Sequence, residues 1–215
     1  MEPGPNECRN RKASVSGKFY PGTEIKLREE VEALFKNAKP FTGSGILPRA
    51  LIVPHAGYIF SGKVAASAFN RLSPGHAPGR VFVLASSHHF HFPGASVYCS
   101  GNYETPLGIV TVDCKTGKTI TGENPSVSNR DDVHLPEHGI EVQLPFLQMR
   151  LGNNFRLVPI ILGTRQPEEC RRLAEILRPY FTPENLFVIS SDFSHYPGYE
   201  DAIATDRATS EAIIS

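Results

Sequence analysis

Histidines follow several apolar runs of the sequence, and these side chains could together hold a metal. One run leads to His55, the next to His88, and a late run leads to Asp192 and His195. Neutral imidazoles bind iron, zinc, copper and nickel, and two histidines with one carboxylate and open positions are typical of ferrous enzymes that handle oxygen. Any one of these histidines could instead be a hydrogen-bonded loop residue. Three of them at the ends of separate apolar runs favour a functional site.

The neighbours of these histidines allow more than one role. His88 and His89 are adjacent, so in an extended segment they point in opposite directions and only one should face the site. Asp192 is a candidate ligand or a group that orients an imidazole, and capping of the following helix is the structural alternative. His195 is a candidate acid/base group because imidazole changes its charge near neutral pH.

A fourth cluster, Glu137-His138-Gly-Ile-Glu141, adds further candidates. In a helix, His138 and Glu141 would share one face because they are three residues apart. They could then enter the pocket as proton-transfer groups or as partners of the ligands. The alternative is that they are polar residues of a helix's first turn. His76 and His134 lie in polar segments, and we give them no role.

The apolar runs that must position these residues are of the buried-strand type. Helical patterns separate the runs, so the sequence predicts a mainly parallel sheet covered on both faces, a three-layer α/β/α fold. In such sheets ligands bind beyond the carboxyl ends of the strands. His55, His88 and His195 should therefore meet at one edge of the sheet. The predicted strands span residues 49–54, 80–85, 155–162 and 186–190.

Several details of this prediction can be checked individually. A helix capped by Thr23 and a second helix beginning at Ser61, with Val64 on its inward stripe, are expected. Pro159 argues that its strand lies at a sheet edge or carries a bulge. Further helices are expected at residues 167–180 and 199–214, and additional strands that could run antiparallel at 95–99 and 109–112.

The composition is that of an ordinary globular protein. The 215 residues fit one domain, 1–215, with residues 1–22 as a polar lead-in segment, and 40% of residues are hydrophobic. Lys plus Arg and Asp plus Glu number 22 each, which does not indicate nucleic acid or an acidic membrane surface as a partner. We expect a cytoplasmic protein because there is no signal-peptide pattern, membrane-spanning run or Cys-x-x-Cys pair.

Two enzyme classes lack their motifs in this chain. No Gly-x-Ser-x-Gly segment of serine hydrolases is present. No glycine-rich phosphate loop follows a predicted strand either, which argues against phosphoryl transfer.

The chemistry-bearing segments resemble those of the Memo family, named for mediating cell motility. The matching segments run in family order across nearly the whole chain. They are Ser16-Gly-Lys-Phe-Tyr-Pro21, Pro54-His-Ala-Gly-Tyr58, Ser86-Ser-His-His89, Tyr103-Glu-Thr-Pro-Leu-Gly108, Glu137-His-Gly-Ile-Glu141 and Ser190-Ser-Asp-Phe-Ser-His195.

The resemblance implies a fold similar to that of class III extradiol dioxygenases, which open catechol-type rings with non-haem iron. By this resemblance His55 and His88 are metal ligands, and His195 with Asp192 stands where the dioxygenases keep an acid/base histidine. The implied metal is Fe(II), with zinc or copper as alternatives. The implied activity is a metal-dependent oxidoreductase acting on a small aromatic or phenolic substrate.

One departure from the family pattern affects the predicted ligand set. Members of the family usually continue beyond the position of Ser215, and their third ligand, a cysteine or glutamate, lies in that later part. We therefore expect the C-terminal part of the family fold to be missing here, with Asp192 and Glu141 as the carboxylates to test. The uncovered sheet surface would favour self-association. The alternative functions are a binding or adaptor protein that recognises a peptide through a vestigial pocket, and a zinc-dependent hydrolase.

Overall fold

The predicted strands form the centre of one six-stranded sheet. The computed structural model describes residues 10–40, 48–73 and 78–215, so residues 1–9 of the lead-in segment and His76 lie outside the described residues. The strand order is β1-β8-β2-β7-β3-β6. The bounds are β1 Ala50–Val53, β8 Asn185–Ser190, β2 Arg80–Ser86, β7 Arg156–Leu162, β3 Ala95–Val97 and β6 Val127–Ser128.

The sheet is mainly parallel, as predicted. β1, β8, β2 and β7 run parallel to one another, β3 is antiparallel to β7, and β6 is parallel to β3. A separate hairpin joins β4 (Tyr103–Thr105) to β5 (Gly108–Val110). Of the two additional strands expected, the first is β3 in the main sheet. The second belongs to this hairpin, and both are antiparallel to a neighbour.

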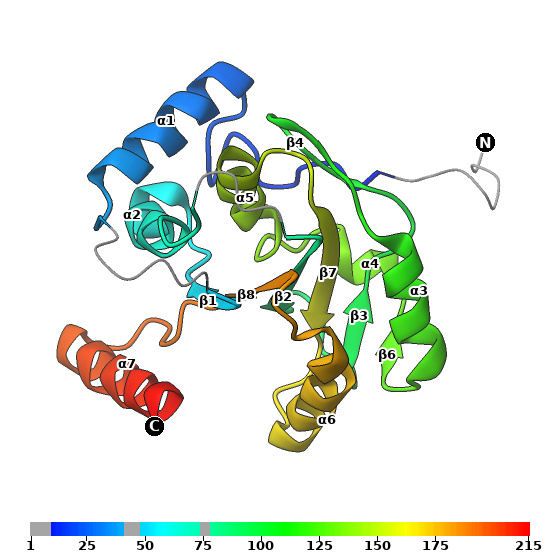
Figure 1. Ribbon diagram of the computed structural model, residues 1–215. Helices are drawn as coiled ribbons and strands as arrows, with labels where there is room; N and C mark the ends of the chain where they lie inside the picture. The colour runs from blue at the N-terminus through cyan, green and yellow to red at the C-terminus, as the bar shows by residue number, and fades with distance from the viewer. Residues whose placement is uncertain (1–9, 41–47, 74–77) are drawn as a thin grey trace.

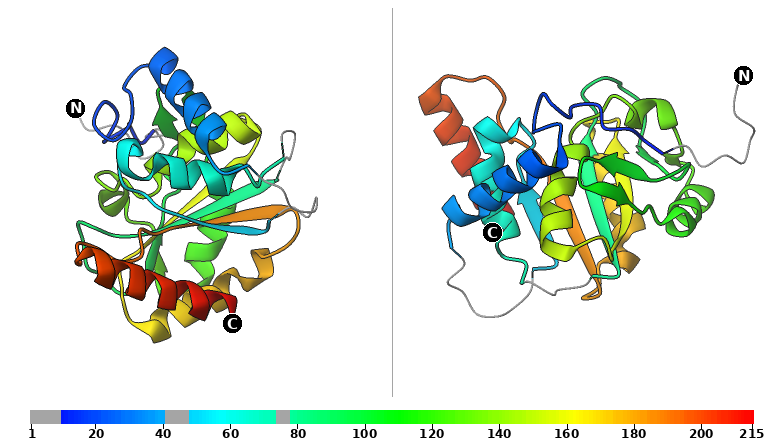
Figure 2. Two further views of the ribbon diagram at one scale, coloured as in Figure 1. Left: turned by 90° about the vertical axis from the view of Figure 1, so that its left-hand side faces the viewer. Right: turned by 90° about the horizontal axis from the view of Figure 1, so that it is seen from above.

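Helices cover both faces of the sheet (Figures 1 and 2). On one face, α1 (Glu24–Asn37), α2 (Tyr58–Phe69) and α5 (Leu144–Leu151) enclose a core that includes Val81 and Val83 of β2. On the other face, α3 (Cys114–Glu123) and α6 (Pro167–Leu177) pack around Phe82 of the same strand. Because successive residues of β2 enter opposite cores, the three-layer α/β/α prediction is confirmed.

The remaining helices are α7 (Tyr199–Ile214), the short α4 (Asp131–His134) and two 3₁₀ turns, Glu141–Gln143 and Arg178–Tyr180. α7 has the bounds expected from the sequence, yet none of its sixteen residues is buried. Among the described residues, no helix combines the length and apolar character needed to cross a membrane.

Two details of the predicted second helix are wrong. α2 begins at Tyr58, not Ser61, because the buried Tyr58 side chain already packs in the core and its backbone N–H bonds the carbonyl of Phe19. Its buried stripe runs through Ser61, Ala65 and Phe69, so the expected inward Val64 is 62% exposed.

The strand that carries Pro159 is central, not at the edge. β7 lies between β2 and β3, and the residue of β3 opposite Ile160 is Val97, where β3 ends. The carbonyl of Pro159 still accepts the backbone N–H of Tyr98 on that side. In a strand, the backbone N and O of one residue point to the same neighbouring strand, so the nitrogen of Pro159 also faces β3. Proline has no N–H to donate there, but β3 ends at this position, so no β3 residue beyond it needs that bond.

Candidate metal centre

The histidines at the strand ends converge at one edge of the sheet. β1, β8 and β2 are parallel neighbours, so the segments that follow them leave on the same side. Ligand atoms of His55, His88 and His195 all lie within 4.8 Å of one another. The rings of His55 and His88 are perpendicular, with centroids 5.0 Å apart. The predicted convergence of these three residues is confirmed. The roles of His55 and His88 as metal ligands and of His195 as an acid/base group stay predictions.

A hydrogen-bond network fixes the orientation of His55. The Ser190 hydroxyl donates its one hydrogen to the carbonyl of Gly139, at 2.6 Å. Its oxygen can then only accept, and it lies 2.9 Å from both the Gln143 amide nitrogen and His55 Nδ1. We therefore assign the hydrogen of His55 to Nδ1, which leaves a lone pair on Nε2. That Nε2 is buried and has no hydrogen-bond partner among the described residues.

The carboxylate of Glu137 orients the ring of His88, as Ser190 orients that of His55, through a contact at Nδ1. It accepts the backbone N–H of His88 at 2.8 Å, and its other oxygen lies 2.9 Å from His88 Nδ1. Burial alone would raise the pKa of Glu137, but these bonds and the N–H of Gly139 outweigh it and lower the pKa to about 2. Glu137 is therefore ionised, and it holds the hydrogen of His88 on Nδ1. In the neutral ring, His88 Nε2 then carries the lone pair. The same hydrogen bond to Glu137 raises the pKa of His88, so a metal at Nε2 competes with a proton.

His138 completes a group of four histidines around the same point. Its ring centroid lies 4.4 Å from that of His88 and 5.5 Å from that of His55. Burial lowers the pKa of His138 to about 4, so the ring is neutral at pH 7. Its Nδ1 lies 3.5 Å from Glu137. His138 thus lies at the site, as predicted, while a role in proton transfer stays a prediction.

Asp192 and His195 reach the site on the loop between β8 and α7. Asp192 accepts the backbone N–H of His55 at 2.5 Å, and its second oxygen lies 3.7 Å from His55 Nε2. α7 begins only at Tyr199, so Asp192 does not cap it. Phe193 and Tyr196 have φ values of 62° and 59°. Each left-handed residue costs about 1–2 kcal/mol, and such strain clusters at functional sites.

Glu141, by contrast, lies away from this group. Its carboxylate is fully buried and accepts hydrogen bonds from the side chains of Arg11, Ser14 and Tyr20. Residues 137 and 138 have no regular secondary structure, 139 and 140 form a turn, and a 3₁₀ helix begins at Glu141. His138 and Glu141 therefore do not share a helical face. The predicted place of Glu141 in the pocket is therefore wrong. It anchors the described part of the lead-in segment to the core.

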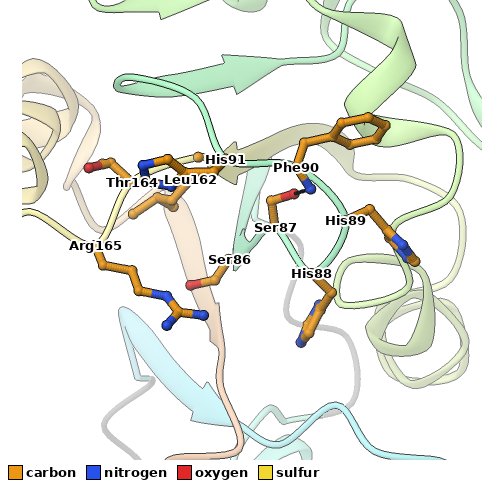
Figure 3. A pocket seen from close by; sticks show the side chains of 10 residues that line it. Ser86, Ser87, His88, His89, Phe90, His91, Leu162, Thr164 and Arg165 are labelled. Atoms are coloured by element: carbon orange, nitrogen blue, oxygen red, sulfur yellow. Dashed lines mark hydrogen bonds between the residues drawn. The ribbon is translucent and has the colours of Figure 1, made fainter.

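The sequence pattern does not by itself indicate the roles of two positioning residues, Glu137 and Ser190. Two features of the sequence could have pointed to these positions. Glu137 directly precedes the candidate His138, and Ser190 is a polar residue at the end of a predicted buried strand that leads to Asp192. Of the adjacent pair, His88 belongs to the histidine group, and Figure 3 shows the His89 ring pointing in a different direction from that of His88.

A cavity of about 290 Å³ opens over the histidine group. One part of its wall is aromatic and includes Phe19, Phe60 and Tyr196, while the other part includes His138, Asp192 and His195. A mostly apolar cavity with a few convergent polar groups is the usual form of a small-molecule site.

The donor set fits a transition metal. A buried imidazole nitrogen without a hydrogen-bond partner loses its hydration without compensation, which is unfavourable unless something else binds the lone pair. His55 Nε2 is such an atom, and His88 Nε2 is fixed in the same tautomer beside it. Two imidazoles with the nearby Asp192 carboxylate match the ligands that iron, zinc and copper accept.

Comparison with known proteins identifies the family of this chain. A sequence model of the Memo-like protein family matches residues 11–215. A MEMO1 family protein of Sulfurisphaera tokodaii is 33% identical over 220 residues, which cover 95% of this chain and 76% of the relative. Relatives with the same description from Desulfurococcus amylolyticus and Aquifex aeolicus are both 36% identical, cover 93% of this chain, and are themselves covered to 76% and 72%. The chain therefore belongs to the Memo-like family.

Proposed function

We propose that this protein binds one transition-metal ion through His55 Nε2 and His88 Nε2, and that ferrous iron is the functional metal. The observation that carries the proposal is that Ser190 Oγ and the Glu137 carboxylate each lie 2.9 Å from an imidazole Nδ1. These contacts assign the hydrogen to Nδ1 and the lone pair to Nε2 in each neutral ring. Such outer partners are typical of histidines that bind metals. Asp192 supports the choice of iron, since two histidines and a carboxylate are a common ferrous ligand set.

We further propose an oxidoreductase activity on a small aromatic or phenolic substrate. Bound ferrous iron would supply the activation of dioxygen beside such a ring. The aromatic wall formed by Phe19 and Phe60 would hold the ring and exclude water. His195, exposed at the cavity wall, would take up or release the substrate proton, and the neutral His138 beside it would serve as a further acceptor.

Anaerobic reconstitution with Fe(II), followed by metal analysis and affinity measurement, tests the metal proposal. His55→Ala and His88→Ala should each lower the affinity at least about 100-fold, because even the loss of an outer partner costs about 10–100-fold. His89→Ala is the matched control, since it removes an adjacent imidazole that belongs to neither group of potential metal ligands among the described residues. Unchanged metal binding in both the His55 and His88 variants would reject the ligand assignment.

Oxygen consumption with catechol then tests the activity. The iron-loaded protein should consume oxygen, and His195→Ala should retain iron but lose most of the turnover, because proton transfer by one side chain contributes about 10²–10⁴-fold. Full turnover in His195→Ala would remove its acid/base role. Tight zinc binding with ester or amide hydrolysis would instead favour a zinc hydrolase, and metal-free protein that still binds a peptide would favour an adaptor.

A further inference from the structure

A second hollow of about 460 Å³ adjoins the histidine group on the other side of His88. It lies between the segments that follow β2 and β7, residues 86–91 and 162–165 (Figure 3). His88 lines both this hollow and the cavity over the metal site, so the two spaces are neighbours across a single side chain. A molecule bound at the metal could therefore extend one of its groups into the hollow.

Backbone contacts hold the two walls of the hollow in place. The N–H of Ser87 donates to the carbonyl of Leu162 at 2.8 Å, and the N–H of Phe92 donates to that of Gly163 at 3.0 Å. A Cβ on Gly163 would lie 2.3 Å from the Phe92 ring, so only glycine allows this approach. The hollow is thus preformed by the strand ends, and a ligand would not need to order a loop in order to bind.

The charge in this hollow comes from Arg165. Its side chain extends from the end of β7 toward Ser86 and the space beside His88 (Figure 3). Among the residues that the structure describes, no acidic group forms an ion pair with Arg165. Arg165 lies close enough to His88 to act on it electrostatically. An unpaired guanidinium aimed into a preformed hollow is a ready partner for a carboxylate, which it can bind with two parallel hydrogen bonds.

We propose that this hollow binds the carboxylate of the molecule whose other end reaches the metal site, with Arg165 as its counter-ion. This inference rests on the proposed function and names its substrate class, a small aromatic carboxylate. The two spaces differ in charge. The cavity over the histidines has aromatic walls and the Asp192 carboxylate, whereas the hollow contains the Arg165 guanidinium. An anionic group would be repelled by Asp192 and attracted by Arg165.

Binding of matched diols to the cobalt-loaded protein under anaerobic conditions tests the proposal. Catechol and 3,4-dihydroxybenzoate present the same diol to the metal, and only the second carries a carboxylate. Arg165→Gln should weaken the binding of 3,4-dihydroxybenzoate at least about tenfold and leave catechol binding unchanged, because a charge-assisted hydrogen bond is lost. Arg156→Gln is the charge-matched control, since Arg156 is exposed at the opposite end of β7.

A metal-free arm separates this inference from the metal proposal. Benzoate should bind the metal-free protein weakly by NMR titration, and Arg165→Gln should abolish that binding while Arg156→Gln preserves it. Equal losses for both diols, or benzoate binding that persists in Arg165→Gln, would overturn the carboxylate site even if metal binds as proposed. If metal fails to bind, the benzoate titration alone decides. Inorganic phosphate and acetate should also be compared as competitors of benzoate. If phosphate displaces benzoate at lower concentrations than acetate does, the hollow prefers a phosphoryl group to a carboxylate, and the proposal is overturned.

Discussion

Glu137 accepts hydrogen bonds from both the backbone N–H and the imidazole Nδ1 of a single residue, His88. The two contacts fix the position of the His88 backbone and the rotation of its ring together. The carboxylate lies on the irregular segment before the 3₁₀ helix, while His88 follows β2, 49 residues earlier in the chain. The orientation of this candidate ligand therefore depends on packing between distant segments.

Glu137→Gln tests this relationship. An amide keeps the shape of the carboxylate but places an NH₂ group against one of the N–H donors, and it removes the charge that holds the hydrogen on His88 Nδ1. We expect metal affinity to fall about 10–100-fold, measured by competition with a chromophoric chelator. Glu104→Gln is the control, because Glu104 pairs with Lys12 at the surface. Unaltered affinity in Glu137→Gln would show that the carboxylate does not tune the ligand.

Ser190→Ala tests the corresponding partner of His55. The substitution leaves His55 Nδ1 and the Gln143 amide nitrogen without the oxygen that they contact. Each buried group that loses its partner costs about 1–3 kcal/mol, so urea unfolding should show a clear loss of stability. Metal affinity should fall about 10–100-fold because the ring is free to change tautomer and rotate. A variant that loses stability but keeps full metal affinity would contradict the tautomer assignment. Ser73→Ala, the same replacement at an exposed serine, provides the control.

The sheet and the position of the site could be predicted from the sequence for a physical reason. Buried parallel strands require continuous apolar runs, and their ends must lie at one edge, so His55, His88 and His195 could be brought together without any knowledge of side-chain contacts. The central position of β7 could not be predicted, because Pro159 is tolerated only through the early end of β3. The length of β3 is a property of a neighbouring strand, and it cannot be inferred from the sequence of β7.

The contacts of the carboxylates Glu137 and Glu141 could not be predicted from the sequence either. Glu137 and Glu141 are four residues apart and would lie on one face of a helix. The segment between them is not helical, so the two carboxylates contact different partners. Glu137 bonds His88, and Glu141 bonds Arg11 of the lead-in segment. Both partners are distant in sequence, so helical periodicity could not distinguish the carboxylate of the site from the structural one.

The assignment of Glu141 as a structural anchor leads to a double-mutant prediction. Glu141→Gln leaves the fully buried Arg11 guanidinium without its counter-charge, and we expect a loss of about 3–5 kcal/mol in the free energy of unfolding. Arg11→Met should cost a similar amount, and the double variant should cost less than the sum because the two side chains contact each other. Metal affinity of the folded Glu141→Gln protein should equal that of the wild type. A selective loss of metal affinity would return Glu141 to the metal site.

His134 provides a pH prediction that is independent of the metal site. It is fully buried, Tyr103 Oη lies 3.1 Å from its Nδ1, and its Nε2 lies 3.2 Å from the carbonyl of Ser96. The neutral ring satisfies both contacts, with Nε2–H donating to Ser96 and Tyr103 O–H donating to Nδ1. Burial lowers the pKa of His134 from 6.5 to about 3. Between these values the unfolded chain binds a proton that the folded protein does not.

Stability should therefore fall as pH decreases through this interval, with His134 contributing a slope of about 1.4 kcal/mol per pH unit below its unfolded pKa. The slope should be measured by urea unfolding between pH 7 and 5, where most carboxylates remain ionised. His134→Gln removes the titrating ring, so its stability should depend less steeply on pH than that of the wild type, whatever its absolute stability. His89→Gln, the same replacement at an exposed side chain, is the control. Equal slopes for the wild type and His134→Gln would mean that His134 is not held neutral by burial.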